Sequence, residues 1–240
     1  ELVQKKIAFP VKPFSESYKY ILEEDKFDSY DELPFVIIGS GLAAVEIAFA
    51  LRKRWKHRPL ILVCKLQKLS DKFIFWLKKF KIILKPKINF NYKRILLCTG
   101  NAPHPWIENN YLRLDSRGRI ITNSTLRSEQ FSNIYAIGDC AYSGKSQLNS
   151  SGILAVKAVK RLSENIKNNL NKKRLKKWYP QKKGLQIVNL FNDSNQSAFA
   201  IYGKFIIGPN INLWKLKNKL DNDFLAKLKP PIMRIDSIKE

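Results

Sequence analysis

Apolar and polar residues follow each other in blocks that predict strands and helices in turn. Short and almost wholly apolar runs, typical of buried strands, lie at 34–38, 59–64 and 94–100. Between them, apolar residues recur every three or four positions in 42–55 and 70–80, which is the spacing of one helix face. Strands that alternate with helices are typical of a parallel sheet built from βαβ units, so the sequence predicts an α/β fold.

Weaker patterns extend this fold along the chain. Residues 81–88 are expected to form a further strand, with Ser70 or Asp71 capping the helix before it. Residues 112–122 predict a hairpin-like piece whose turn lies at 116–118.

The middle of the chain is expected to hold a strand, a long helix and a connection. The apolar run 133–139, "NIYAIGD", predicts a fourth strong strand. Residues 151–170 predict a long helix capped by Ser150 or Ser151, and the Lys-rich stretch 171–183 predicts a solvated connection.

The C-terminal part predicts a small α+β region. Residues 184–191 and 197–207 are each expected to form a strand. In 212–228 apolar residues again recur every three or four positions, which predicts an amphipathic helix. Its apolar face would consist of Leu213, Leu216, Leu220, Phe224 and Leu228.

The chain is strongly basic, with 44 Lys and Arg against 20 Asp and Glu and a formal net charge of +24. Such an excess favours polyanions, whether nucleic acid, an anionic membrane surface or phosphorylated ligands. The excess is mostly Lys and is spread over the whole chain, which equally fits a general drift of composition. Both interpretations stay open at this stage.

The few Cys and His residues argue against a disulfide framework or a zinc site. Cys64, Cys98 and Cys140 are far apart, and the only histidines are His57 and His104. We therefore expect a reducing, cytoplasmic compartment and no metal. No apolar run approaches the ~20 residues that a membrane-spanning helix needs.

One motif points to a dinucleotide. Gly39, Gly41 and Ala44 follow a strand and open a helix with GxGxxA spacing, and the intervening Ser40, Leu42 and Ala43 complete the turn. In a Rossmann-like unit the first glycine permits the tight turn, the second lets backbone approach a pyrophosphate, and the small third residue allows close packing. The phosphates would then lie at the positive end of the helix. The alternative is a tight βα turn without a ligand.

The end of the second strand bears on the choice between NAD and NADP. An acidic residue usually follows that strand in NAD-binding proteins. Here Cys64, Lys65 and Lys68 stand there with no acid, which favours the 2′-phosphate of NADP. A chain with so many lysines could carry them here by composition alone.

Two further segments are candidates for binding. Asp139 ends the predicted strand 133–139 and precedes a helix that begins near Gly152. A carboxylate there could accept hydrogen bonds from sugar-like hydroxyls, and the helix N-terminus could stabilise a developing anion. The alternative is a turn or cap residue. The strand end Leu96–Gly100, "LLCTG", is not specific on its own.

Taken in this order, the three motifs resemble those of the pyridine nucleotide–disulfide oxidoreductase superfamily, flavoproteins with two dinucleotide domains. The resemblance implies FAD and NAD(P) as cofactors. It places the nicotinamide nucleotide on the turn at Gly39–Glu46, with Glu46 near the nicotinamide. Cys98, Thr99 and Gly100 correspond to the family's "ATG" segment, which joins the two domains.

The same resemblance implies an FAD site in the middle of the chain. The segment Thr125–Asp139 matches the family's "T…hyAiGD" motif, with Gly138 and Asp139 as its last residues, and the family's Asp binds the ribityl chain of FAD. The helix that begins at Gly152 and Ile153 matches the one aimed at the flavin pyrimidine edge.

The finer resemblance is to type II NADH dehydrogenases, because the family's redox disulfide is not seen. Several segments also look like the flavoprotein domain fused upstream of selenide, water dikinase. In such fusions the dikinase begins shortly after a segment like "LKPPIM", 228–233. The resemblance therefore implies a fused or partner dikinase, besides a small-molecule electron acceptor. A homodimer is a separate expectation, with the helix at 212–228 and its Trp214 as the candidate surface.

The chain departs from the family pattern in three places. It starts "ELVQKK" without Met, so we expect a segment that lacks the family's N-terminal FAD half. The stretch from Cys64 to Gly100 is short, and the family's "Pro-Lys-Ala-Gly" is replaced by 149–152. Such a segment alone is expected to hold FAD poorly.

These interpretations divide the chain into four parts. We expect a connecting segment at 1–33, an NAD(P)-binding Rossmann-like domain at 34–100, and the C-terminal half of an FAD-binding domain at 101–170. An α+β interface region and linker would follow at 171–240. The expected function is NAD(P)H:acceptor oxidoreduction through FAD, with the alternative of a degenerate flavoprotein-like module for regulation, docking or polyanion binding.

Overall fold

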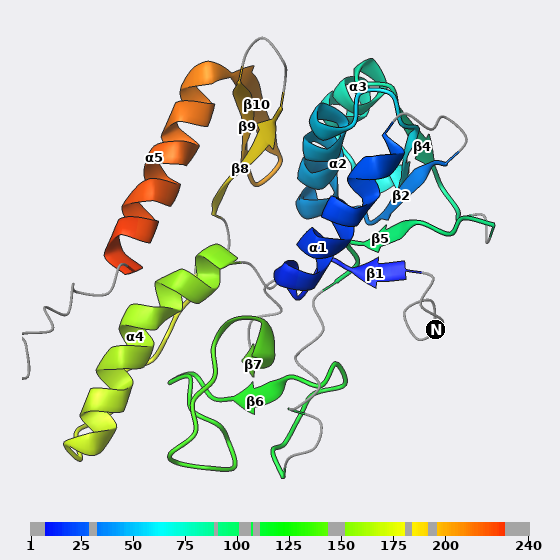
Figure 1. The fold of residues 1–240 in the computed structure, drawn as a ribbon. Helices are drawn as coiled ribbons and strands as arrows, with labels where there is room; N and C mark the ends of the chain where they lie inside the picture. Colours follow the sequence, from blue (N-terminus) through cyan, green and yellow to red (C-terminus); the bar gives the residue numbers. More distant parts are fainter. Residues whose placement is uncertain are drawn as a thin grey trace, which may run out of the picture. The chain divides into compact units, whose positions relative to one another are not determined.

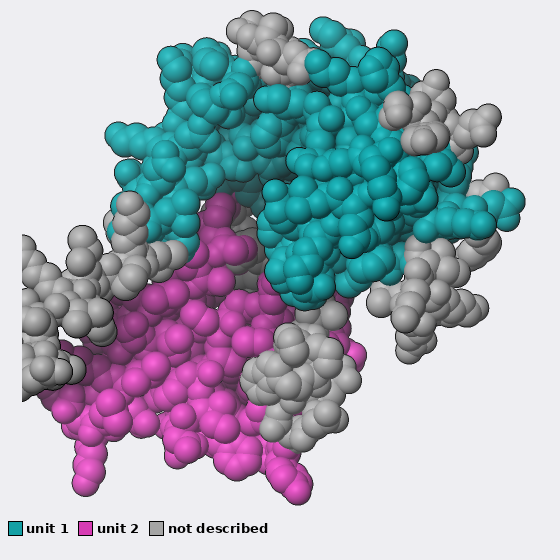
Figure 2. Space-filling model, viewed as in Figure 1, with its two compact units in different colours: residues 1–99, 185–240 teal, residues 100–184 magenta. Residues whose placement is uncertain are grey.

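The computed structural model describes residues 8–28, 33–88, 91–100, 107, 111–143, 152–180, 184–191 and 196–228 (Figure 1). These residues form two compact units, shown in different colours in Figure 2. Unit 1 consists of residues 1–99 and 185–240, and unit 2 consists of residues 100–184. Within the described part of the chain, no helix is both long and apolar enough to cross a bilayer.

A five-stranded sheet forms the centre of unit 1 and confirms the expected α/β class. Its strand order is β1-β5-β2-β3-β4, and every neighbouring pair is parallel. The strands are β1 (Ala8–Pro10), β2 (Phe35–Ile38), β3 (Leu60–Val63), β4 (Ile82–Lys85) and β5 (Ile95–Leu97). The inner strands are buried on both faces, which explains why they are apolar runs without alternation.

Two helices of this unit lie where the apolar periodicity predicts them. These are α2 (Leu42–Arg54) and α3 (Asp71–Lys79). Ser70 caps α3, because its hydroxyl accepts a hydrogen bond from the Phe73 N–H at 3.3 Å. Short 3₁₀ turns, η1 (Asp25–Phe27) and η2 (Leu66–Lys68), follow the first helix and β3.

The first 33 residues are more than the expected connection. Strand β1 pairs with β5 at the edge of the sheet, and α1 (Phe14–Glu24) is a helix of 11 residues. The segment before β2 therefore contributes structure to unit 1. The prolines at 10 and 13 stand outside α1, so they do not interrupt it.

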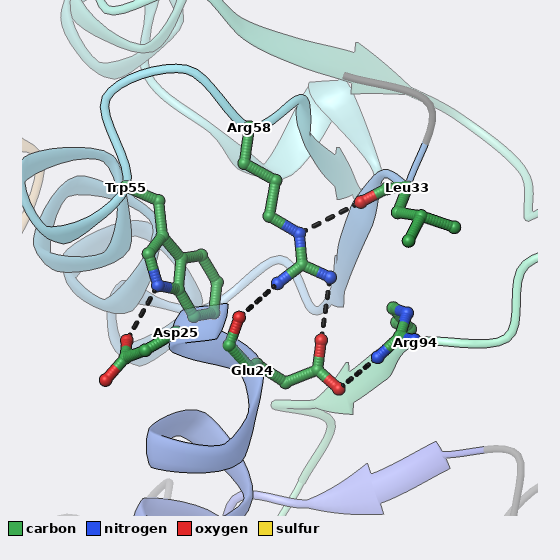
Figure 3. Close-up of polar contacts among 6 residues, drawn as sticks. All are labelled: Glu24, Asp25, Leu33, Trp55, Arg58 and Arg94. Carbon is green, nitrogen blue, oxygen red and sulfur yellow. Dashed lines mark hydrogen bonds and ion pairs between the residues drawn. The ribbon is translucent and has the colours of Figure 1, made fainter. Parts of the chain in front are cut away.

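A buried cluster of charges fixes α1 to the sheet (Figure 3). The two oxygens of Glu24 accept hydrogen bonds from Arg58 at 2.7 Å and from Arg94 at 2.6 Å. The guanidinium of Arg58 also donates to the carbonyl oxygens of Leu33 and Glu24, and its side chain is fully buried. The cluster thus joins the end of α1 to the segments that lead into β2, β3 and β5.

A second set of contacts joins Asp25, directly after α1, to the end of α2. It is exposed to solvent and predicts that the stability of the fold depends on pH. Asp25 accepts hydrogen bonds from Arg54 and from the Trp55 indole N–H, and those from Arg54 hold the pKa of Asp25 below its ordinary value of 3.8. A carboxylate with a lowered folded-state pKa stabilises the fold above its unfolded pKa, and this contribution is lost as the pH falls through the folded pKa. We expect Asp25→Asn to lower the urea midpoint at about pH 7, with the gap to the unmodified protein closing towards about pH 3. A gap that stays constant between these pH values would contradict this account.

The C-terminal elements form a small antiparallel sheet with a helix. The strands β8 (Leu185–Leu190), β9 (Ser197–Tyr202) and β10 (Phe205–Asn210) pair in the order β10-β9-β8, and α5 (Ile211–Leu228) follows. The prediction of a single strand over 197–207 was wrong, because Gly203 has a φ of +62° and turns the chain between β9 and β10. Four apolar side chains of this sheet join the core around α2 and α3: Val188, Leu190, Phe199 and Ile201.

The apolar face expected for α5 is only partly covered. Leu216, Leu220 and Phe224 are 40%, 50% and 40% exposed. The helix packs on β9 through its first half.

Unit 2 contains a long helix and a short parallel pair of strands. The strands are β6 (Ile120–Thr122) and β7 (Ala141–Ser143), and the helix is α4 (Gly152–Leu170). The expected caps Ser150 and Ser151 lie outside the described residues. The bridge between Leu114 and Ile120 confirms the hairpin-like piece around 116–118.

The strong strand predicted at 133–139 is not formed. This segment has a single bridge, between Tyr135 and Arg127, and Gly138 with a φ of +72° then turns the chain into η4 (Gly138–Cys140). The run is apolar because Ala136 is buried in a small cluster beside β6. Apolarity alone therefore does not make it a strand.

The buried Asn165 binds the basic connection that follows α4. Asn165 donates to the carbonyl oxygens of Thr125 and Lys176 at 2.8 Å, and its own oxygen accepts from the Lys176 N–H at 2.8 Å. Residues 171–180 form neither helix nor strand, and these hydrogen bonds explain why they belong to unit 2.

Candidate functional site

The predicted phosphate turn lies at the carboxyl end of β2. Gly41 is the N-cap of α2 in an extended conformation, and its carbonyl oxygen accepts from the N–H groups of Ala44 and Val45. The first N–H groups of a helix have no partner within it. In the described part of the chain, no backbone acceptor pairs with those of Leu42 and Ala43.

The two glycines of the turn have different surroundings. A Cβ on Gly39 would lie 2.8 Å from the Cys98 carbonyl oxygen and 3.0 Å from the Ala44 Cβ. Gly39 therefore allows the close packing of turn, helix and neighbouring strand. A Cβ on Gly41 would meet no atom of the described residues within 4 Å, so these residues leave the space in front of the helix open.

This geometry fits the pyrophosphate of a dinucleotide. Unpaired N–H groups, the positive end of a helix dipole and open space are what a phosphate needs at a helix N-terminus. No acidic residue stands in the first turn of α2 to compete for these groups. Of the predicted residues, Gly39, Ser40, Gly41, Leu42, Ala43 and Ala44 are brought together here.

The end of β3 lies beside the same turn. The Lys65 N–H donates to the Ser40 hydroxyl at 2.8 Å, so the turn and the following loop are tied together. The Lys65 and Lys68 side chains are exposed, whereas Cys64 is buried and burial raises the pKa of its thiol. This is the place where a ribose or its 2′-phosphate would lie in a Rossmann-like unit.

Thr99 and Gly100 lie at the point where the chain leaves unit 1 for unit 2. The Cys98 N–H before them donates to the Ile38 carbonyl oxygen at 2.7 Å, and Gly100 has a φ of +68°. Burial raises the pKa of the Cys98 thiol to about 12, which makes it a poor nucleophile.

Glu46 has partners that the sequence did not indicate. Its carboxylate accepts hydrogen bonds from the Asn189 N–H at 3.0 Å and from the Lys217 ammonium at 2.7 Å. These groups come from β8 and α5, so Glu46 joins α2 to the C-terminal elements. Its proximity to a nicotinamide stays a prediction.

The residues predicted for the flavin lie together in unit 2. A Cβ on Gly138 would lie 3.3 Å from the Ala155 Cβ, in the first turn of α4, so η4 packs against the start of that helix. Asp139 is partly buried in η4, and Gly152 and Ile153 are exposed at the start of α4. A small residue at 138 allows this approach, which puts a carboxylate beside a helix N-terminus.

Comparison with known proteins gives a class for this fold. Residues 63–168 match the family model described as pyridine nucleotide-disulphide oxidoreductase. A probable NADH dehydrogenase from Dictyostelium discoideum is 35% identical over 60 residues, which are 25% of this chain and 13% of that protein.

Solved structures have the same fold at low identity. The sulfide:quinone oxidoreductase of Aquifex aeolicus aligns with a TM-score of 0.60 and 13% identity over 94% of this chain and 65% of its own. An NAD-dependent persulfide reductase from A. fulgidus aligns with a TM-score of 0.53 and 17% identity over 81% of this chain and 40% of its own. The chain thus spans less than two thirds of these proteins. The chain has the same α/β fold as these oxidoreductases.

Proposed function

We propose that this chain is part of an FAD-dependent NAD(P)H oxidoreductase of the pyridine nucleotide–disulfide oxidoreductase family. The open N-terminus of α2, with Gly41 as its cap and unpaired N–H groups beside it, is the observation that carries the proposal. The turn Gly39–Ala44 would hold the pyrophosphate of the nicotinamide nucleotide. The exposed Lys65 and Lys68 would favour NADPH over NADH, because no acid stands beside them to bind a free 2′-hydroxyl.

The flavin would be held by residues of unit 2. Asp139 would accept hydrogen bonds from the ribityl hydroxyls, and the start of α4 at Gly152 and Ile153 would stabilise negative charge on the flavin ring. When bound, FAD supplies the redox chemistry by taking a hydride from the nicotinamide and passing the electrons on.

The electron acceptor and the partners belong to the finer part of the proposal. In the reading closest to type II NADH dehydrogenases, the flavin reduces a small-molecule acceptor without a redox disulfide. We propose that the acceptor is a selenium or sulfur species. Its reduced form would feed a fused or partner selenide, water dikinase.

A regulatory or docking role without turnover is the second candidate. It is favoured by Glu46, because the carboxylate expected near the nicotinamide is bound by Lys217 and the Asn189 N–H. A degenerate domain could keep this tie between α2 and α5 after losing its cofactors.

The two candidate functions differ in whether the protein retains FAD and whether NADPH then reduces it. Because this chain alone is expected to hold FAD poorly, the full-length protein that contains it would be incubated with FAD, desalted and mixed anaerobically with NADPH or NADH. We expect retained yellow colour that NADPH bleaches faster than NADH, and weaker retention in Asp139→Asn. Asp221→Asn, an exposed carboxylate on α5, is the matched control and should retain flavin normally. A colourless protein after desalting would favour the docking role.

A further inference from the structure

Unit 1 has a basic hollow at the end of the sheet opposite to the phosphate turn. Its volume is about 570 Å³, and it is lined by the C-terminal ends of α2 and α3 and by the start of β4. All strands of this sheet are parallel, so the hollow lies at their amino ends, whereas Gly39 and Gly41 follow the carboxyl end of β2. The hollow is therefore separate from the dinucleotide site proposed above.

Positive side chains line the hollow on several sides. The lining includes the cationic residues Arg52, Lys56, Lys78 and Lys81 together with His57, and none of the described residues that line it is acidic. Apart from Arg52, these side chains are exposed. Among the described residues, no carboxylate forms an ion pair with Lys78 or Lys81.

Cations at the C-terminal end of a helix often only balance its dipole and carbonyl groups. Arg52 binds the chain just past the two helices, because it donates to the carbonyl oxygens of Trp55, Lys56 and Lys81. At the end of α3, the N–H groups of Phe80 and Lys81 pair with the carbonyl oxygens of Trp76 and Lys78. The side chains of Lys78 and Lys81 are therefore not needed to bind these carbonyls.

Arg52 also keeps an unused donor. Its Nε–H is buried and has no hydrogen-bond partner within the described part of the chain. Burial lowers the pKa of this guanidinium, against the opposing charge of Asp28. Burial of a charged group is unfavourable, and an anion in the hollow would offset part of this cost by its charge, without reaching the buried Nε.

The remaining wall is apolar. Ile83 is 47% exposed at the hollow, and Pro59 lies beside it. An inorganic anion alone would leave these side chains uncovered. A ligand with both phosphate groups and a less polar part would use both kinds of wall.

We propose that this hollow binds a small, multiply phosphorylated molecule. Its phosphates would lie against Lys78, Lys81 and His57, and its less polar part would cover Ile83. This site goes beyond the proposed oxidoreductase function and does not depend on it.

His57 gives a direct way to test the proposal. The chain contains only two histidines, His57 and His104, so the imidazole signals in a long-range ¹H–¹⁵N NMR spectrum are few, and His57→Gln assigns the one from the hollow. The full chain would be titrated with inorganic tripolyphosphate at constant ionic strength. We expect a saturable shift of the His57 signal.

Charge-matched variants separate a site from general basicity. The double variant Lys78→Gln/Lys81→Gln should weaken tripolyphosphate binding about tenfold or more, since two charge-assisted contacts are removed. Lys204→Gln/Lys219→Gln removes two exposed charges of unit 1 outside the hollow and should bind normally.

Three results would overturn the proposal. The first is a His57 signal that does not move, and the second is an equal loss of affinity in both double variants. The third is tighter binding of a single-stranded oligonucleotide with the same sensitivity to Lys78→Gln/Lys81→Gln, which would make a nucleic-acid backbone the occupant.

Discussion

Glu24→Ala is expected to lower the free energy of unfolding of unit 1 by about 3–5 kcal/mol, the range found when one partner of a buried ion pair is removed. The carboxylate of Glu24 is the counter-charge for both Arg58 and Arg94 (Figure 3). Without it, the guanidinium of Arg58, whose side chain has no exposed surface, would stay buried beside another cation.

The surroundings of Arg58 explain why the loss should be large. Three aromatic rings, those of Phe27, Phe35 and Trp55, lie within 4.8–5.8 Å of its guanidinium carbon. They favour a cation over their faces but cannot replace a carboxylate as a hydrogen-bond acceptor. The carbonyls of Leu33 and Glu24 satisfy only part of the guanidinium.

The measurement is denaturant unfolding followed by tryptophan fluorescence, because Trp55 packs against Arg58. Glu16→Ala is the control on the same helix. Glu16 pairs with Lys19 on the surface, and exposed pairs of this kind contribute about 0–1 kcal/mol. Equal losses in the two variants would contradict the special role of the buried cluster.

Gly41→Ser is expected to weaken nucleotide binding about tenfold or more while leaving the fold as stable as before. The backbone of Gly41 is extended, with φ −90° and ψ 169°, and the site of its Cβ is empty. Serine is a favoured N-cap, so its hydroxyl would accept a hydrogen bond from the first turn of α2. It would thereby occupy the space and the donors that a pyrophosphate needs.

Gly39→Ala is the contrasting variant two residues away. Its Cβ would clash with the Cys98 carbonyl oxygen, so we expect a loss of stability of about 1–3 kcal/mol, as for overpacked sites. Binding of NADPH, followed by its fluorescence, and urea unfolding would be measured for both variants. Unchanged NADPH affinity in Gly41→Ser would refute the assignment of the turn as a phosphate site.

The sheet and the phosphate turn could be predicted because their signals are local. Apolar runs, helical spacing and the separation of Gly39, Gly41 and Ala44 are visible within about 25 residues. The tie at Glu46 could not be predicted in this way. Its partners Asn189 and Lys217 are 143 and 171 positions away, and nothing in their own surroundings marks them.

Two errors have a common physical cause. The segment 133–139 was expected to be a strand, and 197–207 a single strand, because both are apolar. In each case a glycine with positive φ, Gly138 or Gly203, sets where the chain turns. Backbone pairing depends on what lies beside a segment, which apolarity does not reveal. The burial of Arg58 is likewise invisible in a chain with so many exposed cations.

The discontinuous make-up of unit 1 has a consequence for folding kinetics. Strands β8 and β9 complete the core around α2 and α3, yet they follow the whole of residues 100–184 in the chain. Contacts between such distant segments must form against the entropy of closing a long loop, and a high share of them slows folding. If unit 2 folds first, that loop becomes compact and its ends have less space to search. We therefore expect the folding rate of unit 1 to depend on whether residues 100–184 are already folded.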